Sequence, residues 1–234
     1  MDCINVIQIK GKMHRVENKD CEDTFLIEEN EKLYFIGVAD GKSGSCYGKR
    51  GGEIALRCLM EYVGKKGIDL IVNSKYKDEE RYEIIKKIRS VLRIEADAFN
   101  VEVKEFASTM MMCIVDKQSK ECLIIHLGDG CILGVNDTGK IDFLSTPSNG
   151  ITSKYTWTSV SVSAMDHLNI TSGDLTQYNT IYLLTDGCNC FHQGVYLPFR
   201  GQTFLIEANK EKIQKFMEYS VPEDDATMIM MNVE

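Results

Sequence analysis

The chain has 234 residues, 44% of them hydrophobic, so it is long enough for one or two domains and apolar enough to bury a sizeable core. Lysine and arginine number 27 against 35 aspartates and glutamates, which gives a formal net charge of −8. This acidic balance argues against a general nucleic-acid binder and against attachment to anionic lipid, because both need basic patches. It suits a site that gathers carboxylates around divalent cations.

Neither a signal peptide nor a membrane-spanning segment is expected. The first residues, MDCINVIQIKGKMHR, contain no long apolar run, and no window of the chain approaches 18 consecutive apolar residues. The nine cysteines are odd in number and contain no CxxC pair, which is typical of reduced thiols packed in a core. We therefore expect a cytoplasmic protein, and a redox or zinc role for Cys188 and Cys190 is the alternative.

The chain contains only three prolines and no Gly/Ser-rich linker, which favours a single domain over residues 1–234. Its first third predicts short strands at 4–10, 24–28 and 33–39, followed by a Gly-rich loop from Gly41 to Gly52. Apolar residues at three- and four-residue spacing then predict helices over 54–63 and 78–100. The remaining expected elements are strands at 108–115, 121–127, 131–135, 141–144, 155–163 and 179–184, a helix at 204–219, and a closing strand at 226–233.

This order lacks alternating strand–helix units, so a doubly wound parallel sheet is disfavoured. Two mostly antiparallel sheets with helices on their outer faces, an α+β fold, agree better with the pattern. The methionine runs at 110–112 and 228–231 are interpreted as strand core, since methionine is an adaptable apolar side chain.

Acidic residues stand where apolar runs begin or end: Glu22 and Asp23 before TFLIE, Asp40 after FIGVA, Asp129 after LIIHLG, Asp186 after IYLLT, and Asp224 and Asp225 before ATMIMM. If these carboxylates converge, they cannot all ionise without a counter-charge. Hard cations such as Mg²⁺ or Mn²⁺ would supply that charge, since they prefer oxygen ligands. Ordinary turns are the alternative, because Asp-Gly after a strand is also common turn chemistry.

Six segments in this order carry a family resemblance: GKMHRVENKDCEDTF, FIGVADGKSGSCYGKRGGEIAL, ASTMMMCIV, IIHLGDGCILG, YLLTDGCNCF and EDDATMIMM. Together they resemble the metal-dependent protein serine/threonine phosphatases of the 2C (PPM) family, particularly its short bacterial members. The resemblance spans nearly the whole chain. It implies a four-layer α-β-β-α sandwich forming one phosphatase domain, with a shortened flap region at about 145–178.

The resemblance also implies a site for two ions. Asp40 matches the carboxylate that bridges both ions, and Gly41 matches the backbone carbonyl ligand beside it. Asp186 and Asp224 match carboxylates on one ion, and Glu22 matches the acidic group that serves the other. The implied reaction is hydrolysis of phosphoserine and phosphothreonine in proteins by a water activated between two Mg²⁺ or Mn²⁺ ions.

Further acidic positions have subordinate roles in this resemblance. Asp224 is preferred over Asp225 as the ligand because Thr227 fixes the position of the motif. Asp23 is expected to support the network rather than bind directly. A third, weaker ion would use Asp129, but its second ligand position holds Cys190, a soft ligand that suits Mg²⁺ or Mn²⁺ poorly.

The substrate-phosphate contact departs from the family pattern, because Asn18 stands where many members have an arginine. His14 is the first candidate for this contact, with Arg15 and Lys42 as further candidates. Lys42 is a poor acid at neutral pH, so we expect His14 or water to protonate the leaving group. A strand-end histidine bonded to a backbone carbonyl is the alternative for His14. The expected partners are phosphorylated proteins, such as those of a Ser/Thr kinase, and the expected state is a monomer.

Two other functions stay open at this stage. Asn18, Lys42 and Cys190 are compatible with a catalytically weak or inactive phosphatase-like binding or sensor module. Against that hypothesis, the acidic cluster is intact, and carboxylates without a counter-charge would reduce stability. The third possibility is a phosphoesterase that acts on a small molecule, which the same metal chemistry would also serve.

Overall fold

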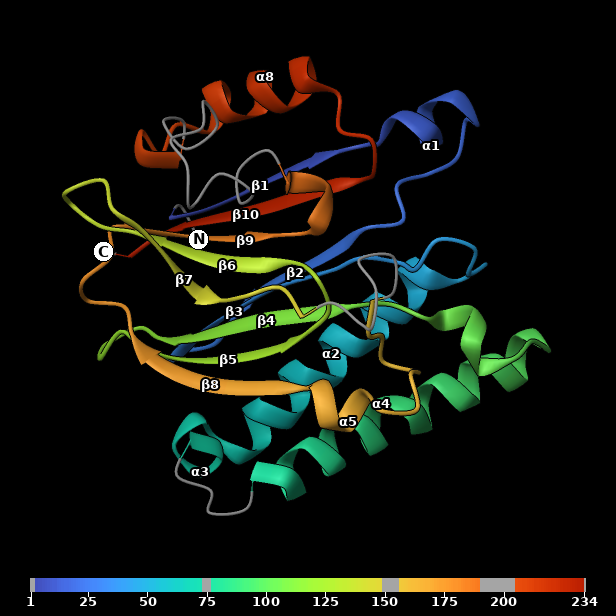
Figure 1. Ribbon diagram of the computed structural model, residues 1–234. Helices are drawn as coiled ribbons and strands as arrows, with labels where there is room; N and C mark the ends of the chain where they lie inside the picture. The colour runs from blue at the N-terminus through green and yellow to red at the C-terminus, as the bar shows by residue number, and fades with distance from the viewer. Residues whose placement is uncertain (1–2, 73–76, 149–155, 190–204, 234) are drawn as a thin grey trace.

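Two five-stranded antiparallel sheets pack face to face in the computed structural model, which describes residues 3–72, 77–148, 156–189 and 205–233 (Figure 1). The first sheet has the strand order β1 (Ile4–Ile9), β10 (Ala226–Asn232), β9 (Thr180–Leu184), β6 (Cys131–Val135) and β7 (Ile141–Ser145). The second has the order β2 (Thr24–Glu29), β3 (Leu33–Ala39), β4 (Met110–Asp116), β5 (Glu121–Leu127) and β8 (Asn169–Asp174).

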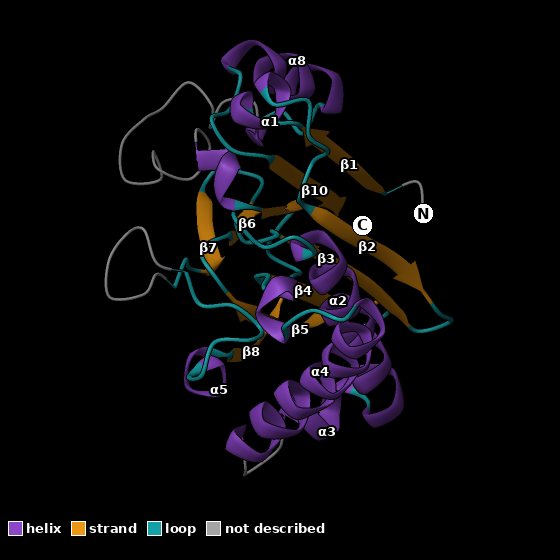
Figure 2. Cartoon of the chain, turned by 90° about the vertical axis from the view of Figure 1, so that its right-hand side faces the viewer, coloured by secondary structure: helices purple, strands orange, loops and turns teal. Residues whose placement is uncertain are grey.

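Helices cover the outer face of each sheet (Figures 1 and 2). The first sheet carries α8 (Lys210–Ser220), and α1 (Lys12–Val16) connects β1 to the rest of the chain. The second sheet carries α2 (Gly48–Lys66), α3 (Ile68–Val72), α4 (Lys77–Phe99), the 3-10 helix η1 (Val103–Phe106) and α5 (Ala164–His167). The expected α-β-β-α sandwich is therefore confirmed. Among the described helices, none is both long and apolar enough to cross a membrane.

The core has three layers that follow from the period-2 alternation of the strands. In β4, Met110 and Met112 face the helices, whereas Met111 and Cys113 face the opposite sheet. Methionines of β10 alternate likewise between the α8 side and the space between the sheets. The interpretation of the methionine runs as strand core is confirmed, because all these side chains are buried.

The strand expected at 155–163 is wrong. Of its described residues, Thr156 makes an isolated bridge and the others form a loop and turns that lead into α5. The strand of this region is β8, further along the chain. The polar sequence of β8, NITSGD, gives no apolar alternation, because β8 is an exposed edge strand paired only with β5. The alternating TWTSVSV run instead has backbone groups bonded outside any ladder: Ser159 N donates to Ser108 O, and Arg89 donates to the Ser159 carbonyl.

Two helix starts also differ from expectation. The Gly-rich segment is not a loop as far as Gly52, because α2 already begins at Gly48 and uses its glycines for close packing. The expected helix at 204–219 corresponds to α8, which begins only at Lys210. Asn209 caps α8, since its side chain accepts a hydrogen bond from Lys212 N at 3.1 Å.

Candidate active site

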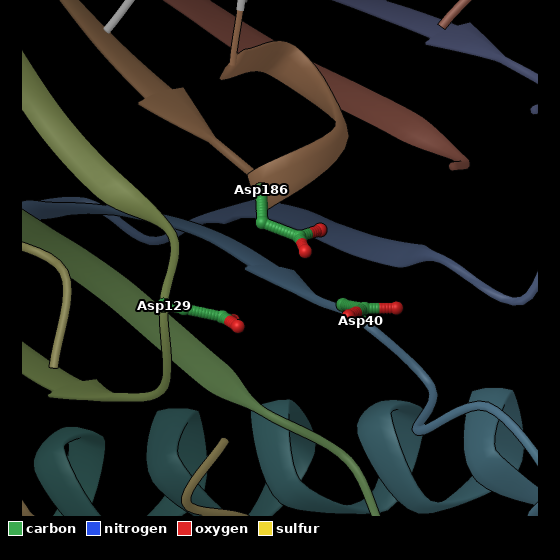
Figure 3. A group of neighbouring side chains, drawn as sticks. All are labelled: Asp40, Asp129 and Asp186. Atoms are coloured by element: carbon green, nitrogen blue, oxygen red, sulfur yellow. The ribbon is translucent and has the colours of Figure 1, made fainter. Parts of the chain in front are cut away.

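Three of the strand-end aspartates converge at one end of the sandwich (Figure 3). Asp40 directly follows β3, Asp129 lies in the turn between β5 and β6, and Asp186 begins the 3-10 helix η2 (Asp186–Cys188) after β9. One carboxylate oxygen of each lies within 4.8 Å of the other two. Both sheets therefore contribute to this cluster, which we call the aspartate triad.

Neighbouring backbone holds the triad in place. Asp40 N donates to the Thr109 hydroxyl and Thr109 N donates back to Asp40 O, each at 2.9 Å. On the other side, the Thr156 hydroxyl donates to a carboxylate oxygen of Asp129. The preceding Gly128 has φ +132°, a conformation that favours glycine and that turns the chain from β5 into Asp129.

The triad carries an electrostatic penalty. Burial raises the pKa of Asp40 well above its usual range, and the charges of Asp23 and Asp186 add to this effect. Burial, followed by the charges of Asp129 and Asp224, raises the pKa of Asp186 to about 7. Within the described part of the chain, Asp186 Oδ1 is buried without a hydrogen-bond partner.

Asp23 lies fully buried behind the triad. Its Oδ2 accepts a hydrogen bond from the Thr185 hydroxyl at 2.9 Å, and burial raises its pKa to about 8. Its Oδ1 has no partner among the residues that the structure describes. Asp23 is inaccessible to solvent, and in its ionised form its charge raises the pKa of Asp40 further.

These residues fit a divalent cation. The triad offers only carboxylate oxygens, which hard ions such as Mg²⁺ and Mn²⁺ prefer, and no histidine or cysteine among the described residues joins it. The unpartnered Asp186 Oδ1 and the raised carboxyl pKa values both indicate a missing positive charge. A cation at this place would therefore relieve the penalty that burial imposes.

A second cluster stands beside the triad and is organised by Asp225, which is 1% exposed. Its Oδ1 accepts from Gly11 N at 2.7 Å, and its Oδ2 accepts from Glu22 N at 2.6 Å. The His14 ring nitrogen Nδ1 lies 2.8 Å from the same Oδ2. A single carboxylate therefore ties the N-terminal segment to the start of β10.

His14 comes from α1 and not from a strand end, and its partner is a carboxylate and not a backbone carbonyl, so the alternative suggested for it is wrong. Because a carboxylate oxygen accepts, the proton of the bond to Asp225 lies on Nδ1. The other ring nitrogen, Nε2, lies 3.9 Å from Glu22 Oε1. Burial raises the pKa of Glu22, while the nearby His14 acts in the opposite direction.

The remaining candidates lie around these two clusters. Asp224 is exposed and lies outside the triad, although its charge contributes to the raised pKa of Asp186. Gly41 is buried where a Cβ would come within 2.8 Å of Glu22 O, so only glycine fits between these segments. Lys42 is exposed next to it, and Arg15 donates its Nε to Lys10 O at 2.7 Å.

Asn18 and Cys190 are the two positions that depart from the family pattern. Asn18 has φ 53°, a left-handed conformation that asparagine tolerates, and it follows the end of α1. Cys190, expected to weaken a third ion, lies outside the described residues. Cys188 is buried and its thiol bonds to Thr227 O, so it is a core residue.

The comparison with protein families decides the class of this molecule. The family model described as protein phosphatase 2C matches residues 10–222. The chain belongs to the protein phosphatase 2C family. The expectation of a protein serine/threonine phosphatase is thereby confirmed, as is the metal dependence that this family shares. No curated protein sequence matches the chain.

Solved structures of similar fold agree with this assignment. A bacterial serine phosphatase is 17% identical, with a TM-score of 0.70 over 99% of this chain and 97% of that one. Serine/threonine phosphatase Stp1 from Staphylococcus aureus is 15% identical, with a TM-score of 0.70 over 99% and 94%. RsbX in complex with magnesium is 14% identical, with a TM-score of 0.60 over 99% and 94%.

Two residues that hold the candidate site are not predicted by the sequence pattern. Asp225 was considered only as a possible ligand, whereas its buried carboxylate holds His14 and the Glu22 backbone. Thr156, the partner of Asp129, lies in the run that was expected to be a strand. Only Asp225 could have been found from the sequence. It is a second acidic residue directly before a buried strand, and a buried carboxylate needs hydrogen-bond donors around it.

Proposed function

We propose that this phosphatase hydrolyses phosphoserine and phosphothreonine in proteins with two Mg²⁺ or Mn²⁺ ions at the aspartate triad. The observation that carries the proposal is the approach of three carboxylate oxygens to within 4.8 Å at the ends of strands from both sheets. When bound, two such ions would acidify a water and offset the charge of the phosphate.

The proposed ligands are those of the family pattern. Asp40 would bridge the ions, with Gly41 O, Asp186 and Asp224 on one side and Glu22 on the other. Asp40 and Asp186 have the geometric support of the triad. The Asp225 bond to Glu22 N supports Glu22, because it fixes the backbone from which that side chain extends.

Asp129 would serve a further, weaker ion. Its oxygen within the triad supports a role close to Asp40 and Asp186. The expected second ligand position of that ion, Cys190, lies outside the described residues.

His14 has the proposed roles of contacting the substrate phosphate and giving a proton to the leaving serine or threonine oxygen. Its support is orientation: the bond from Nδ1 to Asp225 fixes the ring and leaves Nε2 beside Glu22. Lys42 and Arg15 are further phosphate contacts in this proposal. Exposure of Lys42 next to Gly41 supports its place among these contacts.

The test is hydrolysis of p-nitrophenyl phosphate, a phosphothreonine peptide and a set of small phosphate esters, each with Mn²⁺, Mg²⁺ or EDTA. We expect hydrolysis of the peptide that needs added metal and stops with EDTA. Undiminished turnover in EDTA after extensive dialysis would contradict the two-ion site. A preference for a small ester would indicate a small-molecule phosphoesterase, and metal binding without any turnover would indicate a sensor module.

The wider setting of the protein also belongs to this proposal. We expect one domain over residues 1–234, a monomer, a cytoplasmic location and substrates that a Ser/Thr kinase has phosphorylated. Size-exclusion chromatography with light scattering tests the monomer. Incubation with kinase-treated cell extract, followed by quantification of phosphoserine and phosphothreonine, tests the substrate class.

A further inference from the structure

Residues 156–163, which we call the docked segment, are irregular in backbone yet tightly held beside the aspartate triad. Thr158 and Ser159 are 3% and 0% exposed, and Trp157 and Val160 pack against the core between α4 and the second sheet. The ring of Trp157 also stacks on His167 of α5 with a centroid distance of 3.9 Å. The segment is therefore fixed in place without belonging to a sheet.

Arg89, from the middle of α4, holds this backbone. Its Nε donates to Ser159 O at 3.2 Å and its Nη2 donates to Ser161 O at 2.5 Å. A planar guanidinium that bonds two carbonyls fixes both position and orientation, which a single bond would not. On the other side of the segment, Ser159 N donates to Ser108 O at 2.9 Å.

The docked segment reaches the site at two places. The hydroxyl of Thr156, the first described residue of the segment, donates a hydrogen bond to Asp129 Oδ2. Ser108, which accepts the bond from Ser159, also pairs with Gly41 in an isolated β-bridge. The chain of contacts from α4 therefore ends on a triad carboxylate and on the residue beside Asp40.

We propose that Arg89 and Thr156 are positioning residues. Arg89 fixes the docked segment, and the Thr156 hydroxyl orients the Asp129 carboxylate toward the other two aspartates of the triad. A donor bonded to Oδ2 restrains the rotation of the carboxylate and so fixes how it faces a cation. Partners of this kind typically contribute about 10- to 100-fold to metal affinity. The inference rests on the proposed metal site but assigns a role to residues that the family pattern does not name.

The first test compares Thr156→Val with Thr156→Ser. Valine keeps the shape of threonine and loses the donor, whereas serine keeps the hydroxyl. We expect Thr156→Val to weaken about tenfold the binding of the weaker Mn²⁺ ion that Asp129 would serve, measured by calorimetry on the folded protein without substrate. Thr156→Ser should recover most of this affinity. Unchanged affinity for this weaker ion in Thr156→Val would overturn the proposal.

The second test compares Arg89→Met with Arg93→Met on the same helix. Arg93 is exposed four residues further along α4, so Arg93→Met controls for loss of a positive charge there. We expect Arg89→Met to weaken Mn²⁺ binding in the same direction as Thr156→Val and Arg93→Met to leave it unchanged. An Arg89→Met protein that unfolds at lower temperature but binds Mn²⁺ as the wild type does would mean that Arg89 only stabilises the fold.

A double-mutant cycle completes the test. In an Asp129→Ala background, Thr156→Val should have no further effect, because the two side chains act as a pair. If Thr156→Val lowered Mn²⁺ affinity in the Asp129→Ala background as much as in the wild type, the proposal would be overturned. If the wild type binds Mn²⁺ but hydrolyses no phosphoester, the proposed function fails while the affinities still test this inference. If the wild type binds no Mn²⁺, the inference itself fails.

Discussion

Asp224 and Asp225 are neighbours in sequence with opposite surroundings. Asp224 is exposed, whereas Asp225 is 1% exposed and accepts hydrogen bonds from Gly11 N, Glu22 N and the His14 ring. A buried carboxylate is tolerated only when such bonds replace its hydration. The two residues should therefore respond differently to the same substitution.

We expect Asp225→Asn to destabilise the protein by about 3 kcal/mol, because one acceptor oxygen becomes a donor that faces N–H groups. Asp224→Asn is the matched control and should leave stability nearly unchanged while it lowers activity. Urea unfolding of the metal-free proteins gives the first quantity, and p-nitrophenyl phosphate hydrolysis gives the second. Equal stability of the two variants would contradict the structural role of Asp225.

Asp40→Asn should abolish activity without harming the metal-free fold. Burial and the charges of Asp23 and Asp186 raise the pKa of Asp40, so an uncharged amide should keep or raise the melting temperature of the metal-free protein. Rate measurement with saturating Mn²⁺ tests the catalytic part. A variant that keeps more than about a tenth of the wild-type rate would argue against a bridging role, because its activation barrier would have risen by less than about 1.4 kcal/mol.

Much of the candidate site could be predicted from the sequence, since Asp40, Asp129 and Asp186 each follow a recognisable apolar run. Alternate strands of an antiparallel sheet, such as β3 and β5, also end at the same edge. The bond between Thr156 and Asp129 could not be predicted, because it joins residues 27 apart through a segment without regular structure. Long-range contacts of this kind leave no periodic signal.

At the scale of elements, α2 contains glycines that a sequence pattern cannot tell apart. A Cβ on Gly51 would lie 1.9 Å from Phe106 O, so α2 approaches η1 more closely than alanine permits. A Cβ on Gly64 would meet no atom within 4 Å. The first glycine is required by packing, whereas the second only weakens the helix.

Gly51→Ala and Gly64→Ala should therefore change stability in opposite directions. We expect Gly64→Ala to stabilise the protein by about 0.5–1 kcal/mol, since alanine is the better helix former. Gly51→Ala should destabilise it by about 2 kcal/mol or more, because η1 must move to admit the methyl group. Chemical denaturation of both variants measures the difference, and a stabilising Gly51→Ala would contradict the close packing of α2 on η1.

Most elements followed from local patterns, and the errors have physical causes. The expected strand at 33–39 is confirmed with the same bounds in β3, where every position from Phe35 onward is buried. The expected strand at 155–163 failed because its alternating residues are held by Arg89 and Ser108 rather than by a ladder. β8 was missed because its edge position allows a polar sequence.

At the scale of the whole molecule, the space between the two sheets is apolar with a notable polar pair. His126 of β5 and Ser145 of β7 are 3% and 4% exposed, and His126 Nδ1 lies 2.7 Å from the Ser145 hydroxyl oxygen. This contact joins the second sheet to the first near the aspartate triad. The effect of this contact on the free energy of unfolding should therefore depend on how the two sheets pack together.

Burial lowers the pKa of His126 to about 4, whereas a histidine in the unfolded chain titrates near pH 6.5. Between these values the unfolded chain binds a proton that the folded protein does not, so the free energy of unfolding falls as the pH decreases. The His126 contribution to this loss should reach about 2 kcal/mol at pH 5 and about 3 kcal/mol near pH 4. Above pH 7 the contribution is absent, because both states are neutral.

The variants His126→Asn and Ser145→Ala isolate this effect, since the aspartates titrate alike in each protein and cancel in the comparison. At pH 7 we expect His126→Asn to be less stable than the wild type, because it loses packing volume between the sheets. This difference in the free energy of unfolding should narrow by about 2 kcal/mol at pH 5, because only the wild type is destabilised there by protonation of His126 in the unfolded chain. Ser145→Ala keeps the buried imidazole and should keep the wild-type slope. Urea unfolding from pH 7.5 to 4.5 measures all three, and a pH-independent gap between wild type and His126→Asn would mean that His126 titrates normally in the folded protein.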